Sequence, residues 1–224
     1  MLRLMNEDHL IPAGRREQAH RVEVRLEEHY PDARSALNFS TAFELLVATV
    51  LSAQTTDVRV NQVTPRLFSS YPDAVALAGA DREELEATVH SLGMGQRRTD
   101  QLIRLGHHLV HEHEGRVPGT REALTRLPGV GRKTANVVLG NWFDLEEITV
   151  DTHLGRVARR LGWTEQTNPG LVENDLRALL PEAPWTKLSH QLILLGREFC
   201  KARKPQCGAC FLSDICPKIL GKSA

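Results

Sequence analysis

All four cysteines of this 224-residue chain lie in one stretch near its C-terminus, and this constrains the fold most. Their spacing is Cys200-x6-Cys207-x2-Cys210-x5-Cys216. A cytosolic chain disfavours structural disulfides, and cysteines scattered through a core would not cluster in this way, so the spacing predicts a four-thiolate metal site. Four thiolates suit tetrahedral zinc and a [4Fe–4S] cluster equally well by ligand count. The spacing alone leaves both groups open.

The rest of the chain has the periodicity of α-helices. Apolar residues recur at helical intervals in stretches that start at Leu102, Leu154 and Leu188. Residues 43–53 are apolar nearly all round, which is typical of a central helix in a bundle. Strand signals are limited to residues 148–150, which are too few to build a sheet. The sequence therefore predicts an all-α fold, preceded by a loose arm, residues 1–14, that carries no strong pattern.

Overall charge favours no particular partner, because 28 Lys and Arg residues balance 28 Asp and Glu residues. Any signal for nucleic acid must be local, and basic residues do gather in 156–160 and 197–204, although solvated helix faces look the same. No apolar run approaches the length of a membrane span, and the first residues lack the apolar core of a signal peptide. We expect a cytoplasmic protein that does not enter the membrane, at the nucleoid if it binds DNA.

The loop between the first two cysteines is basic. It places Lys201, Arg203 and Lys204 on a short segment that a bound metal would close. Such a loop could present its charges to phosphates, with an affinity that does not depend on base sequence and falls as salt rises, because each neutralised phosphate releases counterions. These three residues are candidate DNA contacts.

Residues 120–141 predict two short helices joined by the tight turn Leu127-Pro128-Gly129-Val130-Gly131. Two glycines let the backbone approach a ligand closely, and the turn points amide N–H groups and the positive end of the second helix dipole toward that ligand. A DNA phosphate is a natural acceptor. A plain corner between two helices, with glycines needed only for geometry, would have the same sequence.

Two residues with useful chemistry lie at expected helix starts. Lys133 is in the first turn of the helix after the hairpin, where the helix dipole favours the neutral amine, a nucleophile. Asp151 is placed to cap the following helix. Each residue alone has an ordinary explanation, as a surface lysine and as a capping aspartate. A catalytic role depends on the combination of motifs.

That combination resembles the endonuclease III family of DNA glycosylases, over residues 20–218. Besides the cysteines, the motifs that carry the resemblance are LSAQTTD at 51–57, LPGVGRKTAN at 127–136 and VDTH at 150–153. The resemblance implies a two-lobed helix–hairpin–helix glycosylase fold. One lobe would be a six-helix barrel, residues 35–145, and the other an iron–sulfur domain formed by residues 15–34 and 146–224.

The resemblance also implies the ligands. The four cysteines would bind a [4Fe–4S] cluster, which the spacing alone does not decide. Double-stranded DNA would lie across the cleft between the lobes and contact the hairpin residues Gly129, Val130 and Gly131 on one side and the basic loop on the other. The substrates would be duplexes with oxidised pyrimidines or abasic sites, and the enzyme would act as a monomer.

A base inside a duplex cannot be attacked at its sugar C1′, so the family flips the damaged nucleotide out and fills the gap. Gln54 matches the glutamine that fills it, and Met94 matches an apolar wedge that is usually leucine. Lys133 would attack C1′, and the resulting Schiff base would undergo β-elimination. Asp151 would stabilise the positive charge on the sugar and help to deprotonate the lysine. Gly95 replaces a bulkier residue, so we expect a more flexible wedge loop.

Two other functions fit part of the sequence. An adenine glycosylase for mismatches shares the hairpin, the aspartate and the cluster, but it lacks a lysine at the position of Lys133 and carries an additional C-terminal domain, whereas this chain ends eight residues after Cys216. A non-catalytic DNA-binding module would use the hairpin and a structural metal. The presence of both Lys133 and Asp151 favours an enzyme.

Overall fold

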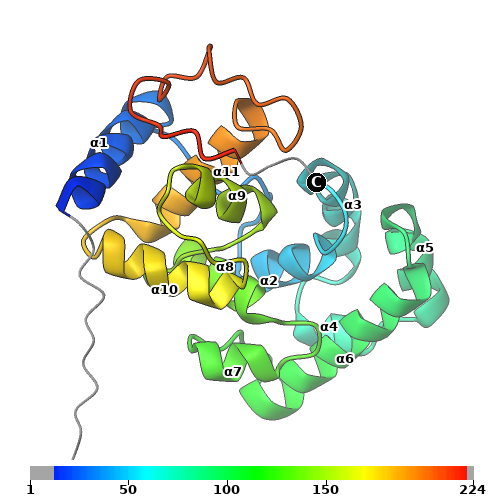
Figure 1. Ribbon diagram of the computed structural model, residues 1–224. Coiled ribbons are helices and arrows are strands. Elements are labelled where there is room, and N and C mark those ends of the chain that lie inside the picture. Colours follow the sequence, from blue (N-terminus) through cyan, green and yellow to red (C-terminus); the bar gives the residue numbers. More distant parts are fainter. Residues whose placement is uncertain (1–12, 221–224) are drawn as a thin grey trace, which may run out of the picture. The chain divides into compact units, whose positions relative to one another are not determined.

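The computed structural model describes residues 13–220 (Figure 1), and over this range it contains helices and turns and no strand. The predicted all-α class is confirmed. Most of the expected loose arm, residues 1–12, lies outside the described residues. The prediction that the arm extends to residues 13 and 14 is wrong, because α1 (Ala13–His29) begins at residue 13. A proline directly before residue 13 is a common signal for a helix start.

The chain divides into two compact units. Arg34–Thr149 contains the hairpin and is called the hairpin unit here; Met1–Ala33 with Val150–Ala224 contains the cysteines and is called the cysteine unit. Residues 146–149 belong to the hairpin unit, where the side-chain amide of Asn136 donates a hydrogen bond to the Ile148 carbonyl at 2.7 Å. Each unit is described by itself.

The hairpin unit is built around an almost fully buried helix. Its helices are α2 (Ala42–Leu51), α3 (Asp57–Ser70), α4 (Ala74–Ala78), α5 (Arg82–Val89), the 3-10 helix η1 (His90–Leu92), α6 (Gly95–His113), α7 (Arg121–Arg126) and α8 (Arg132–Trp142). Every residue of α2 from Leu45 to Leu51 is buried, as its all-round apolar sequence predicts. α2 packs against α3 and α8, and α6 packs against α4 and α5. The buried α2 thus gives the rest of the unit a fixed base.

The cysteine unit contains α1, α9 (Thr152–Arg160), α10 (Pro169–Leu179) and α11 (Trp185–Glu198). α11 packs against both α1 and α9. Beyond α11 the described chain forms turns without a helix as far as residue 220. Arg25 of α1 anchors these turns, because it donates to the Phe211 carbonyl at 2.8 Å and pairs with Asp214. None of the helices that the structure describes is long and apolar enough to cross a membrane.

Candidate functional site

The predicted helix–hairpin–helix is present. Thr120 is the N-cap of α7, and Gly131 is the N-cap of α8, where it has no side chain to cap the first turn. The turn between them is closed by a hydrogen bond from the Val130 N–H to the Leu127 carbonyl at 3.1 Å. Within residues 13–220, the N–H groups of Gly129 and Gly131 donate to no protein acceptor. They are therefore available to an anion at the positive end of the α8 dipole.

Val130 does not match its expected role as a DNA contact. Its side chain is only 6% exposed and packs in the core, and its N–H is used to close the turn. An apolar residue at this position anchors the hairpin while the flanking glycines keep its outer edge free of side chains. The structure therefore gives Val130 a part in shaping the hairpin, and leaves Gly129 and Gly131 as the candidates for phosphate contact.

Gly129 is required for two reasons. Its φ is +81°, a left-handed conformation that side chains disfavour. A Cβ atom at this position would also lie 1.5 Å from Nε2 of Gln101, whose side chain lies against the turn. Nothing in the sequence pointed to Gln101, because it comes from α6 and reaches the hairpin only in the folded unit.

A second support joins both hairpin helices to the segment that follows them. Arg121 of α7 donates to Oδ1 of Asn136 of α8 at 3.2 Å and pairs with Glu147. Asn136 is 2% exposed, and its amide group binds the Ile148 carbonyl. Because Asn136 is buried and the three side chains are linked through hydrogen bonds, they fix the angle between α7 and α8. In the sequence, Asn136 stood out only as the end of a motif.

Lys133 lies in the first turn of α8 with its side chain exposed. No described carboxylate of the hairpin unit pairs with its ammonium group. An amine in this position is accessible to a ligand that reaches the hairpin. The expected location of Lys133, directly after the turn, is therefore confirmed, and its role is taken up below.

Asp151 is the N-cap of α9, as predicted. Its Oδ1 accepts a hydrogen bond from the Leu154 N–H at 2.8 Å, and the side chain is half-buried. A capping carboxylate is held in one orientation, because its backbone is extended and one of its oxygens is fixed by the helix N–H. The same geometry leaves a negative charge at a defined position.

The two candidate gap-filling residues lie in different loops of the hairpin unit. Gln54 follows α2 and is exposed; Met94 is the residue before α6 and is 45% exposed. Both have a left-handed backbone, with φ of +61° and +54°. Arg98 of α6 donates hydrogen bonds to the backbone of both loops. Nothing in the sequence distinguishes Arg98 from an ordinary surface cation.

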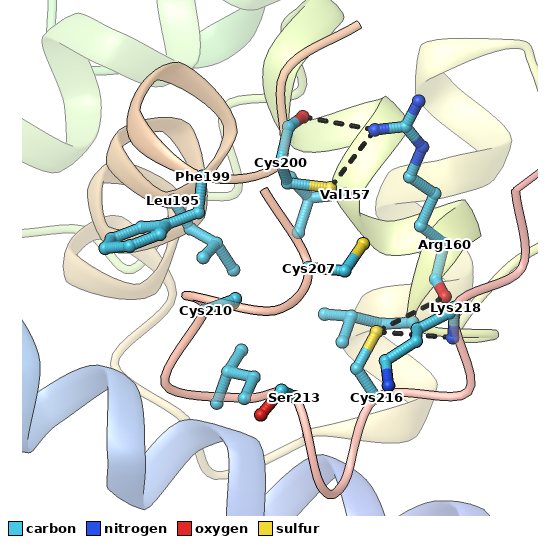
Figure 2. Close-up of a pocket in the computed structure, with 12 residues that line it drawn as sticks. Val157, Arg160, Leu195, Phe199, Cys200, Cys207, Cys210, Ser213, Cys216 and Lys218 are labelled. Atoms are coloured by element: carbon cyan, nitrogen blue, oxygen red, sulfur yellow. Dashed lines mark hydrogen bonds between the residues drawn. The ribbon is translucent and has the colours of Figure 1, made fainter. Parts of the chain in front are cut away.

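The four cysteines line a single pocket in the cysteine unit (Figure 2), whose apolar lining includes Val157, Leu195 and Leu212. Within residues 13–220, no three metal-binding side chains converge closely enough to hold a single ion. Thiolates that line one apolar pocket without converging on a single point fit a polynuclear cluster better than one zinc ion.

Arginines of α9 hold the start of the segment that carries the four cysteines, residues 200–216, which is called the cysteine loop here. Arg160 donates to the Cys200 sulfur at 3.4 Å and to the Lys201 carbonyl at 2.8 Å, and Arg156 donates to the Cys200 carbonyl at 2.9 Å (Figure 2 shows the bonds of Arg160 to Cys200). The basic run 156–160 that suggested a DNA-binding face thus serves partly to bind the protein's own backbone.

The cations of the loop itself remain exposed. Lys201, Arg203 and Lys204 all have exposed side chains, and Lys204 has a φ of +52°. Charges held on a folded segment and open to solvent can be neutralised by phosphates at little cost in conformational entropy. The structure is therefore compatible with their expected role as DNA contacts.

Two family models match the chain. Residues 47–182 match the HhH-GPD superfamily of base excision DNA repair proteins, and residues 200–216 match the iron–sulfur binding domain of endonuclease III. The second match covers all four cysteines. It confirms the iron–sulfur cluster that was expected and decides against zinc.

Similar proteins and structures agree with these matches. The chain is 46% identical over 206 residues to endonuclease III of Synechocystis, covering 92% of this chain and 94% of that protein. It is 41% identical over 201 residues to endonuclease III of Escherichia coli K12, covering 89% and 95%. A non-covalent endonuclease III–DNA complex superposes with a TM-score of 0.86 at 39% identity, covering 91% and 95% of the two chains. A trapped covalent endonuclease III–DNA intermediate has the same TM-score and identity, with 91% and 96% coverage.

Proposed function

Because the chain belongs to the endonuclease III family of HhH-GPD base excision repair enzymes, which makes it a DNA glycosylase and abasic-site lyase, we propose that it removes oxidised pyrimidines and nicks the strand through a lysine Schiff base. The observation that carries this proposal is the exposed amine of Lys133, the second residue of α8. It follows closely on Gly129 and Gly131, whose N–H groups donate to no acceptor among the described residues. A phosphate at the hairpin would bring the sugar of a bound strand toward that amine.

In the proposed reaction the Lys133 Nζ forms a bond to C1′ of the damaged nucleotide. The glycosidic bond breaks, and the base leaves with its electron pair and takes up a proton. The C1′–O4′ bond of the sugar ring then breaks, O4′ takes up the proton that the attacking amine loses, and an iminium forms between Nζ and C1′. Loss of a proton from C2′ of this iminium breaks the C3′–O bond and expels the 3′ phosphate by β-elimination. Water finally hydrolyses the imine and releases the lysine as the amine. The neutral amine of Lys133 is the only protein group that reacts covalently, and it is regenerated at the end of the reaction.

Asp151 is proposed as the electrostatic partner of this chemistry. Positive charge develops on the sugar as the base leaves, and a fixed carboxylate stabilises it without needing to reorganise. The cap on α9 supports the proposal, because the hydrogen bond from Leu154 holds one carboxylate oxygen in place. The same carboxylate could accept the proton that the Lys133 ammonium must lose before it attacks.

The protein binds duplex DNA, and we assign the contacts as follows. The N–H groups of Gly129 and Gly131 bind a phosphate, and the exposed cations of the cysteine loop bind others. Gln54 and Met94 fill the gap left by the flipped nucleotide. We further propose that the enzyme acts as a monomer at the nucleoid, on oxidised pyrimidines and abasic sites.

The iron–sulfur cluster, held by the four cysteines, would supply folding energy to the loop after α11. The residues around it support such a role. Arg160 and Arg156 satisfy the backbone carbonyls where the loop begins, and Arg25 holds its far side through Phe211. The cations Lys201, Arg203 and Lys204 would then be held on a rigid segment.

Borohydride trapping on a thymine-glycol duplex tests the proposal. The wild-type protein should form a covalent complex and nick the strand, whereas Lys133→Gln should do neither and should keep its affinity for the duplex. Lys187→Gln is the matched control, since Lys187 pairs with Glu27 on the surface and its loss should have little effect. Trapping by Lys133→Gln, or excision of mismatched adenine without trapping by the wild type, would contradict the proposal.

A further inference from the structure

Arg98 places a charged guanidinium in the interior of the hairpin unit. Its side chain is 4% exposed, and burial lowers its pKa, although an arginine remains protonated. Its hydrogen bonds to described residues all end on backbone carbonyls, and none ends on a carboxylate. A buried charge is costly unless its donors are satisfied. Arg98 therefore needs these carbonyls, and they in turn need Arg98.

The carbonyls come from two segments that are far apart in sequence. Arg98 Nη1 donates to the Leu51 carbonyl at 2.7 Å and Nη2 to the Ala53 carbonyl at 2.8 Å, both at the end of α2. Its Nε donates to the Gly93 carbonyl at 2.8 Å, and Nη2 also reaches Leu92 at 3.4 Å, both at the end of η1. Helix ends leave carbonyls without intrahelical partners and carry partial negative charge. One planar group thus joins the ends of two helices.

Two of these bonds fix the residues proposed to fill the gap in the duplex. The Ala53 carbonyl belongs to the peptide unit that leads into Gln54, and the Gly93 carbonyl belongs to the one that leads into Met94. Both residues have positive φ, which is unfavourable for residues other than glycine and persists only where the surroundings enforce it. The guanidinium holds both peptide planes at once.

We infer that Arg98 is a positioning residue for base flipping, which makes the Gln54 loop and the Met94 loop one rigid wedge. The inference rests on the proposed function, because it assumes that these two side chains enter the duplex. It adds that their spacing is set by a third residue that does not touch DNA. The side chains of Gln54 and Met94 would then enter the duplex together. Loss of the Arg98 hydrogen bonds would impair the insertion of both.

Arg98→Lys tests the inference with the charge retained. A lysine has one nitrogen and lacks the planar fork, so it cannot span both loops. We expect unchanged affinity for undamaged duplex and about tenfold or greater loss of single-turnover excision, since the substitution removes hydrogen bonds made by a charged group. Fluorescence of 2-aminopurine placed opposite an abasic-site analogue should change less on binding than with wild type. Arg104→Lys, an exposed arginine on the same helix, is the matched control and should match wild type.

A double-mutant cycle separates positioning from general support of the fold. In a Gln54→Ala/Met94→Ala background, Arg98→Lys should cause little further loss, because the side chains it positions are gone. A full additional tenfold loss in that background would overturn the inference. If Arg98→Lys does not fold, hydrogen exchange of the wild type decides instead: residues 51–55 and 92–96 should open together, and independent opening would overturn the inference.

The two proposals can fail separately. A wild-type protein that does not excise thymine glycol removes the proposed function. If the wild type excises thymine glycol, Gln54→Ala/Met94→Ala slows excision and Arg98→Lys does not, only the role of Arg98 is removed. Normal excision by Gln54→Ala/Met94→Ala removes the wedge role and, with it, this inference.

Discussion

Single residues in this protein combine a structural role with a chemical one, and Asp151 shows how the two can be separated. Its carboxylate caps α9 and carries the charge proposed to stabilise the reacting sugar. Asparagine caps a helix about as well as aspartate but is neutral. The choice of substitution therefore decides which role is removed.

We expect Asp151→Asn to retain the thermal stability of the wild type and to slow single-turnover excision by about 10²- to 10³-fold, the usual effect of one well-placed electrostatic group. Duplex affinity should be kept or increased, because a carboxylate repels phosphates. Asp151→Ala should in addition cost about 1 kcal/mol of stability, through loss of the cap. Asp73→Asn, at the cap of α4, is the control and should leave excision unchanged. A wild-type rate for Asp151→Asn would exclude the electrostatic role.

The sequence showed those residues whose signal is local. The cysteine spacing, the glycine-rich turn and the aspartate before α9 are each contained in a few neighbouring positions, and the structure has each in its expected element. Arg98 and Gln101 were missed because their partners are distant: Arg98 bonds residues 45 and 47 positions away. Val130 was misjudged because a motif does not tell which of its members point inward.

At the scale of elements, the hairpin turn depends on two glycines for different reasons. Gly129 has a positive φ and is in contact with Gln101, whereas Gly131 has an ordinary φ of −92° and open space where a Cβ would stand. The first glycine is needed for folding of the turn. Gly131 is not needed for the backbone conformation. Because it has no side chain, it keeps the outer edge of the hairpin accessible.

Alanine at each position should separate these effects. Gly129→Ala should lower the free energy of unfolding by about 1–2 kcal/mol because of the left-handed backbone, while the flexible end of the Gln101 side chain moves aside. Gly131→Ala should leave the melting temperature nearly unchanged and weaken duplex binding, because its methyl group would stand beside the N–H that we propose binds a phosphate. Thermal unfolding and filter binding measure the two. An unstable Gly131→Ala, or one with wild-type affinity, would exclude this account.

The cysteine loop is an element that depends on its bound group. We expect the purified protein to be yellow-brown, with broad visible absorption and about four irons. Cys207→Ala should lose that absorption and unfold at lower temperature, because binding energy becomes folding energy where the unfolded chain has no site. Ser213→Ala, at the same pocket but without a thiolate, should retain both. Four-iron content with unaltered stability in Cys207→Ala would contradict a structural cluster.

At the scale of the whole molecule, a chain with no net charge must bind DNA with a few well-placed cations. Arg98, Arg156 and Arg160 use their donors on the protein's own carbonyls, so they are poor candidates for phosphate contact. Arg203 and Lys204 are exposed on the cysteine loop. For DNA binding, the positions of individual exposed cations therefore matter more than the net charge of the chain.

Arg203→Ala combined with Lys204→Ala should reduce the slope of log affinity against log salt by about one unit for each phosphate that the protein no longer neutralises. Arg15→Ala with Arg16→Ala changes the net charge equally, on the exposed start of α1, and should leave the slope nearly as it is. Binding measured from low to physiological salt gives both slopes. Equal slopes for the two double variants would remove the cysteine loop from the DNA interface.

The helix α6 connects two tasks that the chain otherwise keeps in separate segments. Arg98 holds the gap-filling loops, and Gln101, three residues further along the same helix, lies against the hairpin glycine. At about 1.5 Å of rise per residue, the two supports are about 4.5 Å apart along the helix axis. A rigid helix of fixed pitch thus sets the distance between the hairpin that we propose binds a phosphate and the loops that we propose fill the gap in the duplex. Lengthening or kinking α6 would change this distance. It would therefore change the separation along the duplex between the bound phosphate and the flipped nucleotide.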